Sequence, residues 1–467
     1  MTDPTPLPDE ESWAEALQYI DSYLGYRQGF DRIPGVQAAI YARGGVALSK
    51  AYGHADVEND TVLTERHLFR IASHSKTFTS TAVMQLVDAG TMRLDDRADR
   101  WVGALDGHPT GAVTVRELLG HVSGLTRDST NGDFWQLEGS FPDHDRLLEI
   151  LQDPRTAVIG EQERFKYSNI AYGLLGLIIE SVTGTTYARA VRSGIVDPLG
   201  LTDLGPELDP SRLADYAVGY SALSYAQHRV PIDHVDTEAL ASATGFYSTA
   251  TDLVQYFAAH FVGDERLLSD RAKREMQHPW WDTGATTDKQ YGLGLAVATV
   301  GERTLIGHGG GYPGHITNSM ADTKAGLAVS VLTNCIDGPA ETLARAVIRL
   351  IDLAAAKERP HAGVGDPNRF CGRYAALWGV VDIAVLGGRL YRLHPALADP
   401  VDDAAELEIA DESTLRISGG SGYGSYGELM PFTFANDGTV VSLRGESGGT
   451  LVPIGAFELP DRVTVRE

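Results

Sequence analysis

A chain of 467 residues is long enough for two or three domains and a large hydrophobic core. Its formal net charge of −24 at pH 7 repels nucleic acid and anionic membranes, so neither is expected as a partner. The first residues form neither a basic nor an apolar leader, and no apolar run reaches about 18 residues. These features together predict a cytoplasmic protein.

Cysteine and histidine patterns give no indication of a metal. Cys335 and Cys371 are the two cysteines of the chain, too few for a disulfide framework, and we expect both as reduced, half-buried thiols. No CxxC, HExxH or EF-hand pattern occurs. The sequence therefore predicts no metal and no other cofactor.

The N-terminal part predicts a helix followed by a β-hairpin. Ser12 is placed to cap a short helix with apolar residues on one side. Two strand-like runs, residues 36–41 and 46–52, then flank a turn at 43–45 that contains two glycines. Short strands around such glycines are typical of a hairpin.

Ser73 and Lys76 lie three residues apart at the predicted start of the next helix, which Gly90 ends. This spacing puts both side chains on one helical face, so Lys76 can reach Ser73 Oγ. The free N–H groups and the positive dipole end of a helix N-terminus can also stabilise an oxyanion. The pair therefore suggests a nucleophile, a base and part of an oxyanion hole. The alternative is an N-cap serine followed by a solvated lysine.

The segments after this helix predict an α/β (α+β) fold. Helical runs broken by Gly, Pro and Asp loops extend over about residues 94–240. Strand-like runs follow between residues 291 and 332, and an amphipathic helix over 341–353 closes this part. A hairpin, an inserted all-helical subdomain, consecutive strands and a closing helix indicate a largely antiparallel sheet flanked by helices.

The C-terminal part is predicted to form a separate β domain. Residues 358–367 have the Pro and Gly content of a linker. Beyond them, eight short strand-like runs with glycine-containing turns predict a small antiparallel barrel or sandwich. We therefore expect a first domain over 1–357, the linker, and a β domain over 368–467. In that domain Ser447 fits the nucleophile-elbow pattern G-x-S-x-G, but no helix follows it, so a turn is expected.

Tyr167 and Asn169 lie on a loop before an apolar helical run over 169–182, and they form the single Tyr-x-Asn pattern of the chain. A catalytic tyrosine would have its pKa lowered from about 10 by nearby cations so that it can accept a serine proton. The alternatives are a packing tyrosine with its hydroxyl in water and an asparagine that caps the helix.

His308 begins a stretch of one histidine and three glycines, residues 308–311, after a strand-like run over 303–306. The glycines let a ligand lie along the strand edge, and a backbone N–H here can complete an oxyanion hole. The alternative is a Gly-rich turn with a surface histidine. Residues 309–314 also fit G-x-G-x-x-G, but no helix follows them, which argues against a dinucleotide site.

Three short motifs occur in an order that resembles the serine β-lactamase and penicillin-binding-protein superfamily: Ser73-x-x-Lys76, Tyr167-x-Asn169 and His308-Gly309-Gly310. The pattern is most similar to its class C-like branch of esterases, D-aminopeptidases and related serine hydrolases. The resemblance covers residues 30–355, and further similar stretches are residues 114–125, 245–253 and 291–294. The tail after residue 368 looks like the lipocalin-like β domain that some members carry.

The resemblance implies a serine hydrolase of the SxxK type that works without a cofactor. Ser73 would attack the substrate carbonyl and form an acyl-enzyme, which water then hydrolyses. Lys76 and Tyr167 would share the proton transfers, and which of the two is the base in acylation stays open. Asn169 would contact Lys76 or the acyl-side amide of the substrate.

On the substrate side, the chain departs from the family. The backbone N–H groups of Ser73 and Gly311 would form the oxyanion hole, and Gly310 and His308 would line the substrate. Penicillin-binding members and β-lactamases carry a lysine where this chain has His308. A neutral imidazole offers a hydrogen bond but no fixed charge for a substrate carboxylate. We therefore expect small esters, amides or peptides as substrates, as for esterases, amidases and D-aminopeptidases.

Two other functions remain as alternatives. One is β-lactamase or D,D-peptidase (penicillin-binding) activity, which the histidine disfavours. The other is a catalytically silent relative that serves as a binding or scaffold protein. The β domain is expected either to cap the active-site cleft or to mediate formation of a homo-oligomer.

Overall fold

The computed structural model describes residues 5–224, 226–284, 286, 289–355, 365–420, 425–459, 461 and 463. The chain divides into two compact units. The large unit contains residues 33–344 and the short stretch before Pro6, and the barrel unit contains residues 6–32 and 345–467. The domain boundaries expected from sequence, 1–357 and 368–467, stay a prediction, because residues 358–364 of the expected linker lie outside the described residues.

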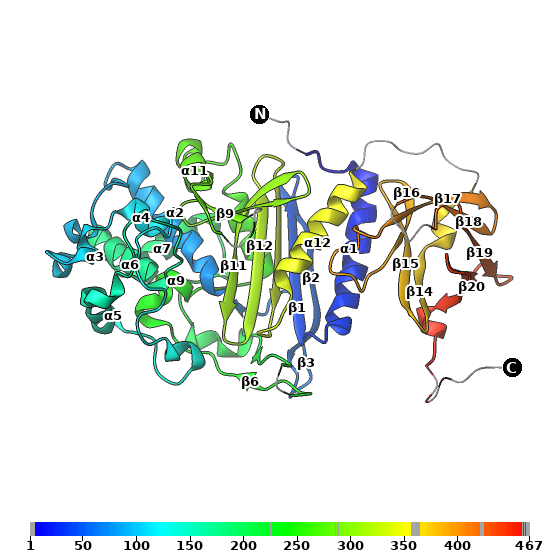
Figure 1. Cartoon of the computed structure of the whole chain (residues 1–467), viewed down its shortest axis with the longest axis horizontal. Coiled ribbons are helices and arrows are strands. Elements are labelled where there is room, and N and C mark those ends of the chain that lie inside the picture. The colour runs from blue at the N-terminus through cyan, green and yellow to red at the C-terminus, as the bar shows by residue number, and fades with distance from the viewer. Residues whose placement is uncertain are drawn as a thin grey trace. The chain divides into compact units, whose positions relative to one another are not determined.

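An antiparallel sheet of nine described strands forms the centre of the large unit, in the order β3-β2-β1-β13-β12-β11-β10-β9-β8 (Figure 1). The strands are β1 (Gly35–Ala42), β2 (Gly45–Asp56), β3 (Thr61–Val62), β8 (Trp281–Asp282), β9 (Lys289–Tyr291), β10 (Ala296–Val300), β11 (Arg303–Tyr312), β12 (His315–Asp322) and β13 (Leu327–Thr333). The expected hairpin is β1–β2, and β1 also pairs with β13 in the register Val36↔Thr333. This sheet confirms the predicted antiparallel core. Helix α10 (Ala250–Ala258) packs against β1 and β13.

Besides α10, further helices lie between β3 and β8 in the large unit, and those from α3 to α8 fall within the helical subdomain expected over about residues 94–240. They are α2 (Ser75–Asp88), α3 (Pro109–Ala112), α4 (Val115–Leu119), α5 (His144–Gln152), α6 (Asn169–Thr183), α7 (Tyr187–Val191), α8 (Asp197–Leu199), α9 (Ala241–Thr244) and α11 (Asp270–Gln277). Helix α6 is buried along almost its whole length and packs against α2, α4 and α9. Two short two-stranded ribbons lie outside the nine-stranded sheet, β4 (Phe69–Arg70) with β7 (Tyr247–Ser248) and β5 (Gly219–Tyr220) with β6 (Pro231–Ile232).

The barrel unit contains a closed antiparallel barrel, which decides between the expected barrel and sandwich. Its strands are β14 (Gly372–Ala376), β15 (Gly379–Leu386), β16 (Arg389–Leu393), β17 (Ala405–Asp411), β18 (Thr414–Gly420), β19 (Leu429–Phe434), β20 (Val440–Arg444) and β21 (Thr450–Pro453). Closure occurs where Tyr374 of β14 pairs with Pro453 of β21. Alternating apolar residues, among them Tyr374, Leu415 and Phe432, fill the core of the barrel. Ser447 lies in the turn between β20 and β21, as expected.

The first helix differs from its prediction. Helix α1 (Glu10–Phe30) is long rather than short, and it begins after Asp9, whose carboxylate accepts the Ser12 N–H at 2.9 Å. Ser12 is therefore a donor to the cap and not the cap itself, because the aspartate three residues earlier already satisfies the free N–H. Helix α1 packs on β15, where Tyr19 donates to Asp382 at 3.1 Å.

The closing helix and the two cysteines can also be compared with their predictions. Helix α12 (Ala340–Ala354) matches the expected closing helix. Both cysteines are free thiols, but Cys335 is fully buried, so its expected half-burial is wrong, while Cys371 is partly exposed. Among the described residues, no helix combines the length and apolar character needed to cross a bilayer.

Candidate active site around Ser73

Ser73 lies in a single 3₁₀ turn, Ala72–His74, directly before α2. The helix expected to start at Ser73 therefore starts at Ser75, and no side-chain cap bond marks the N-terminus of the turn or of α2. This excludes the alternative of a helix-capping serine. Ala72 has a φ of +47° although it is not glycine, which is a strained conformation for a residue with a Cβ. Ser73 is partly exposed on this turn, between β4 and α2.

Lys76 is the second residue of α2 and fully buried, with its side-chain nitrogen beside the serine. The Lys76 Nζ lies 3.3 Å from Ser73 Oγ, 2.7 Å from Asn169 Oδ1 and 2.9 Å from the Ala243 carbonyl oxygen. Burial lowers the pKa of Lys76 well below its usual value. The two carbonyl oxygens can only accept, so an uncharged Lys76 donates both its N–H groups to them and turns its lone pair toward the Ser73 hydroxyl.

Asn169 begins α6, but the cap of that helix is its neighbour. The Ser168 Oγ accepts the Ala171 N–H at 3.0 Å, so the prediction of Asn169 as the capping residue is wrong. The Asn169 amide instead spans two residues, with Oδ1 on Lys76 and Nδ2 donating to Asp128 Oδ1 at 2.6 Å. A flipped amide would point Nδ2 at Lys76 and Oδ1 at a carboxylate, so Asp128 fixes the orientation of the amide.

Tyr167 is half-exposed and completes the group around the serine. Burial raises the pKa of Tyr167, while its hydrogen bond with Ser73 and the positive charge of Arg127 act in the opposite direction. The Lys76 Nζ lies 4.8 Å and the Arg127 Cζ 5.2 Å from the centre of the Tyr167 ring. Two basic side chains thus lie beside the ring as the sequence suggested, but the raised pKa keeps the phenol protonated at neutral pH, contrary to the expected lowering.

His308 lies on β11, buried, with both ring nitrogens engaged. Its Nδ1 lies 2.6 Å from the Gly309 carbonyl oxygen, which can only accept, and its Nε2 lies 3.0 Å from the Tyr291 hydroxyl. A neutral ring with the proton on Nδ1 fits both partners, because Nε2 then accepts from the tyrosine. Burial, followed by the charge of Lys76, lowers the pKa of His308 to about 3. The ring therefore carries no charge at neutral pH.

The glycines after His308 lie in the part of β11 that is no longer paired with β10. Strand β10 pairs with β11 only as far as Gly307, and β11 then runs beside the turn that carries Ser73. A Cβ on Gly310 would lie 2.2 Å from the Ile71 carbonyl oxygen, so a side chain cannot be accommodated there. Gly311 is exposed, and its nearest neighbour to a Cβ, Ile316, lies at 3.5 Å. The close approach at Gly310 brings the strand against the turn.

Three further residues belong to this site and were not predicted. Asp128 has no motif around it and is recognised by its hydrogen bonds alone. Tyr291 and His121 lie in stretches that resemble the family, but neither had a role assigned. The His121 ring lies 4.2 Å from the Tyr167 ring, and its Nδ1 accepts the Ser168 N–H at 3.2 Å. The structure brings Ser73, Lys76, Tyr167 and Asn169 into one cluster, with His308 6.4 Å from the Tyr167 ring centre.

Comparison with known proteins identifies the family to which this chain belongs. A family model described as Beta-lactamase matches residues 21–353. Penicillin-binding protein 4* of Bacillus subtilis (strain 168) is 28% identical over 316 residues, which cover 64% of this chain and 67% of that protein.

Two solved structures have a similar fold. D-amino acid amidase from Ochrobactrum anthropi SV3, complexed with D-phenylalanine, has a TM-score of 0.59 and 28% identity, covering 72% of this chain and 97% of that chain. The octameric penicillin-binding protein homologue from Pyrococcus abyssi has a TM-score of 0.65 and 23% identity, covering 93% of this chain and 99% of that chain. At this identity the similarity concerns the fold alone. The family model matches most of this chain, which therefore belongs to the Beta-lactamase family, among the serine hydrolases of the β-lactamase and penicillin-binding-protein superfamily.

Proposed function

We propose that this protein hydrolyses small esters, amides or peptides through an acyl-enzyme on Ser73. The observation that carries the proposal is the environment of Lys76: a buried amine with a lowered pKa, two obligate acceptors and a serine hydroxyl at 3.3 Å. An amine held in this way is a base aimed at a nucleophile. Burial would lower the pKa of any lysine, so the contact with the Ser73 hydroxyl is what gives this amine a catalytic role in the proposal.

In the proposed reaction, Lys76 is the base in acylation. The Ser73 hydroxyl proton moves to the Lys76 lone pair while Oγ bonds to the substrate carbonyl carbon. The oxygen that becomes negative accepts hydrogen bonds from the backbone N–H groups of Ser73 and Gly311. The protonated phenol of Tyr167 donates to the departing alcohol or amine and is reprotonated from Lys76. Water then attacks the acyl-enzyme ester by the same transfers in reverse.

The uncharged His308 supports substrates without a carboxylate at this position. Both of its ring nitrogens are occupied by Tyr291 and Gly309, so it offers no cation to a ligand. The similarity to a D-amino acid amidase, solved with D-phenylalanine, favours amides of amino acids among the candidates. Asp128, 16% exposed and adjacent to Asn169, is a carboxylate at the site that a substrate ammonium group could approach.

The test is hydrolysis of p-nitrophenyl acetate and D-alanine p-nitroanilide by the wild type and by Ser73→Ala. We expect loss of activity by a factor on the order of 10³ or more in the variant. Labelling by a fluorophosphonate should also require Ser73. Equal rates in the two proteins, or no labelling of the wild type, would instead support a silent binding or scaffold protein.

A penicillin-directed activity is the second candidate, and Arg127 favours it. This arginine has a 68% exposed side chain and is a permanent cation over the ring of Tyr167, although it also pairs with Asp128 at 3.3 Å. It could receive the carboxylate of a penicillin in place of the missing lysine. Rapid nitrocefin hydrolysis that is lost in Arg127→Ala would support this candidate over the first. The homo-oligomer expected from the sequence stays a prediction, which sedimentation of the full chain tests.

A further inference from the structure

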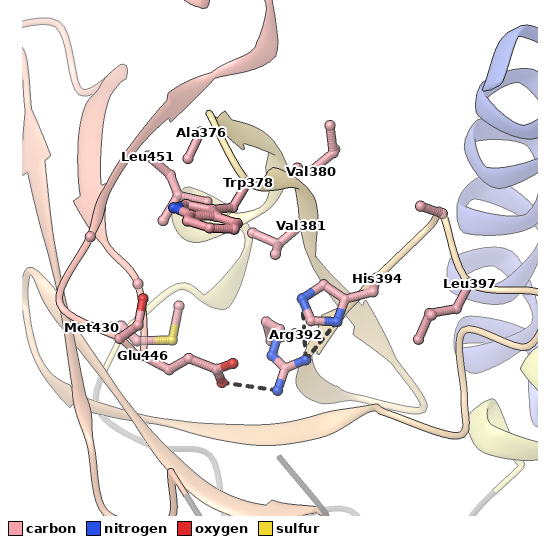
Figure 2. Close-up of a pocket in the computed structure, with 15 residues that line it drawn as sticks. Ala376, Trp378, Val380, Val381, Arg392, His394, Leu397, Met430, Glu446 and Leu451 are labelled. Atoms are coloured by element: carbon pink, nitrogen blue, oxygen red, sulfur yellow. Dashed lines mark hydrogen bonds and ion pairs between the residues drawn. The ribbon is translucent and has the colours of Figure 1, made fainter. Parts of the chain in front are cut away.

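The barrel unit has a cavity of its own, of about 420 Å³ (Figure 2). Strands β14, β15, β16, β19 and β21 contribute to it, together with the turn after β20. Its walls are mainly apolar, formed by Ala376, Trp378, Val380, Val381, Met430 and Leu451. The volume lies within the range of small-molecule sites in proteins. None of its lining residues belongs to the group around Ser73.

Trp378 gives the cavity an aromatic residue that the barrel itself does not bury. It lies in the turn between β14 and β15, and the residue is 97% exposed although it lines the cavity. Its neighbour Leu377 is 58% exposed. The apolar core of the barrel is complete without them. An exposed indole beside an apolar cavity is placed to cover an apolar ligand.

The polar end of the cavity is formed by Arg392, which is 2% exposed. Its Nη2 donates to Glu446 at 2.9 Å and its Nη1 to Asp403 at 2.7 Å, while its Nε has no hydrogen-bond partner among the described residues. A buried guanidinium N–H without an acceptor is rare, because such a group is costly to bury. The unpaired Nε–H of Arg392 is a hydrogen-bond donor, so a ligand that pairs with it must supply an acceptor.

Glu446 is the replaceable member of this ion cluster. It lies in the turn between β20 and β21, outside any strand, and its side chain is 27% exposed. It contacts Arg392 through one oxygen, whereas a carboxylate can bind the Nε and Nη2 of an arginine with both. On the other side, His394 Nδ1 and Arg392 Nη1 both lie 2.7 Å from Asp403 Oδ2, so the arginine stays fixed if Glu446 turns outward.

We propose that this cavity binds a medium-chain carboxylic acid. The apolar chain lies along the wall formed by Val381, Met430 and Leu451 under the Trp378 indole. The carboxylate takes the Nε and Nη2 of Arg392, and Glu446 turns into solvent. This assignment satisfies the unpaired donor, covers the exposed indole and leaves each buried charge paired. It is independent of the hydrolase reaction, because no step of that reaction uses the barrel.

The test is calorimetric titration of the full-length Ser73→Ala protein with octanoate, octylamine and octanol, which share one chain and differ in the head group. We expect saturable binding of octanoate, with octylamine and octanol at least tenfold weaker. Octanoate should also change the tryptophan fluorescence of the protein, and Trp378→Phe should remove that change. Absence of saturable octanoate binding at millimolar concentration, or tighter binding of octylamine, overturns the proposal.

Two variants at the polar end separate the proposal from a simple apolar cavity. Glu446→Gln removes the carboxylate that competes for Arg392, so octanoate should bind several-fold more tightly. Arg392→Met should abolish the preference for octanoate over octanol. Because Arg392→Met can also destabilise the barrel, Glu446→Gln is the deciding variant, with its circular dichroism and unfolding midpoint compared with the parent. Weaker octanoate binding in Glu446→Gln contradicts the assignment.

Discussion

Replacing Asp128 tests whether the hydrogen bonds behind Lys76 hold the base in place. In Asp128→Ala, the buried Asn169 loses the acceptor that lies 2.6 Å from its Nδ2. A buried donor left unpaired costs about 1–3 kcal/mol, and the amide can regain a partner only by rotating its Nδ2 toward Lys76. If this cost falls on the transition state, kcat/KM should drop about 5- to 150-fold, at 1.36 kcal/mol for each factor of ten.

Asp128→Asn separates the geometry of this contact from its charge. An asparagine oxygen still accepts from Asn169, so the amide keeps its orientation and the loss in kcat/KM should be smaller than in Asp128→Ala. The charge effect appears in the pH profile. Lys76 accepts a proton only when uncharged, so kcat/KM rises with pH through the pKa of Lys76. The Asp128 carboxylate raises that pKa against the larger effect of burial, so its removal should move the acid limb to lower pH.

The assay is kcat/KM for p-nitrophenyl acetate between pH 4 and 10 in wild type, Asp128→Ala and Asp128→Asn. Asp133→Asn is the matched control, since it removes an exposed carboxylate from the same segment and contacts none of the site residues described here. The reasoning fails if Asp128→Ala retains activity within twofold of the wild type. It also fails if the acid limb of Asp128→Asn moves to higher pH.

Two further predictions concern stability. Gly310→Ala places a Cβ 2.2 Å from the Ile71 carbonyl oxygen, so we expect the free energy of thermal unfolding to fall by about 1–3 kcal/mol and activity to be reduced. Gly311→Ala is the control and should keep the stability of the wild type. Equal melting temperatures of the two variants would contradict this expectation. Ser168→Ala removes the cap bond to Ala171 and should cost about 1 kcal/mol in urea unfolding, and an unchanged midpoint would mean that another group caps α6.

The elements that could be predicted from the sequence depend on short-range patterns. The eight barrel strands follow from alternating apolar residues between glycine-containing turns, and the β1–β2 hairpin from two such runs around a turn. The contact between Lys76 and Ser73 follows from one turn of chain. The family resemblance then added Tyr167 and His308, which spacing alone could not connect to the serine.

The residues that were missed are determined by long-range contacts. Ser168 and Asn169 are both good capping residues. The sequence cannot show that the Asn169 amide bonds to Lys76 and Asp128 and that the cap is therefore Ser168. Asp128 reaches Asn169 from 41 residues away, with no pattern to mark it. The sequence also suggested basic neighbours that would lower the pKa of a catalytic Tyr167, but it could not show that desolvation of the phenol has the larger, opposite effect.

The pairing of β1 with β13 has a consequence for synthesis of the protein. The register Val36↔Thr333 joins the first strand of the sheet to its last along the chain. At about 5–20 residues per second, the β1–β2 hairpin waits about 15–60 s on the ribosome with one edge open before β13 exists. Strand β11, which lies beside the Ser73 turn, also emerges late in this interval. An unfinished chain therefore has the serine and the lysine but not the strand against which substrate would lie, and we expect folding of the large unit to be slow and cooperative.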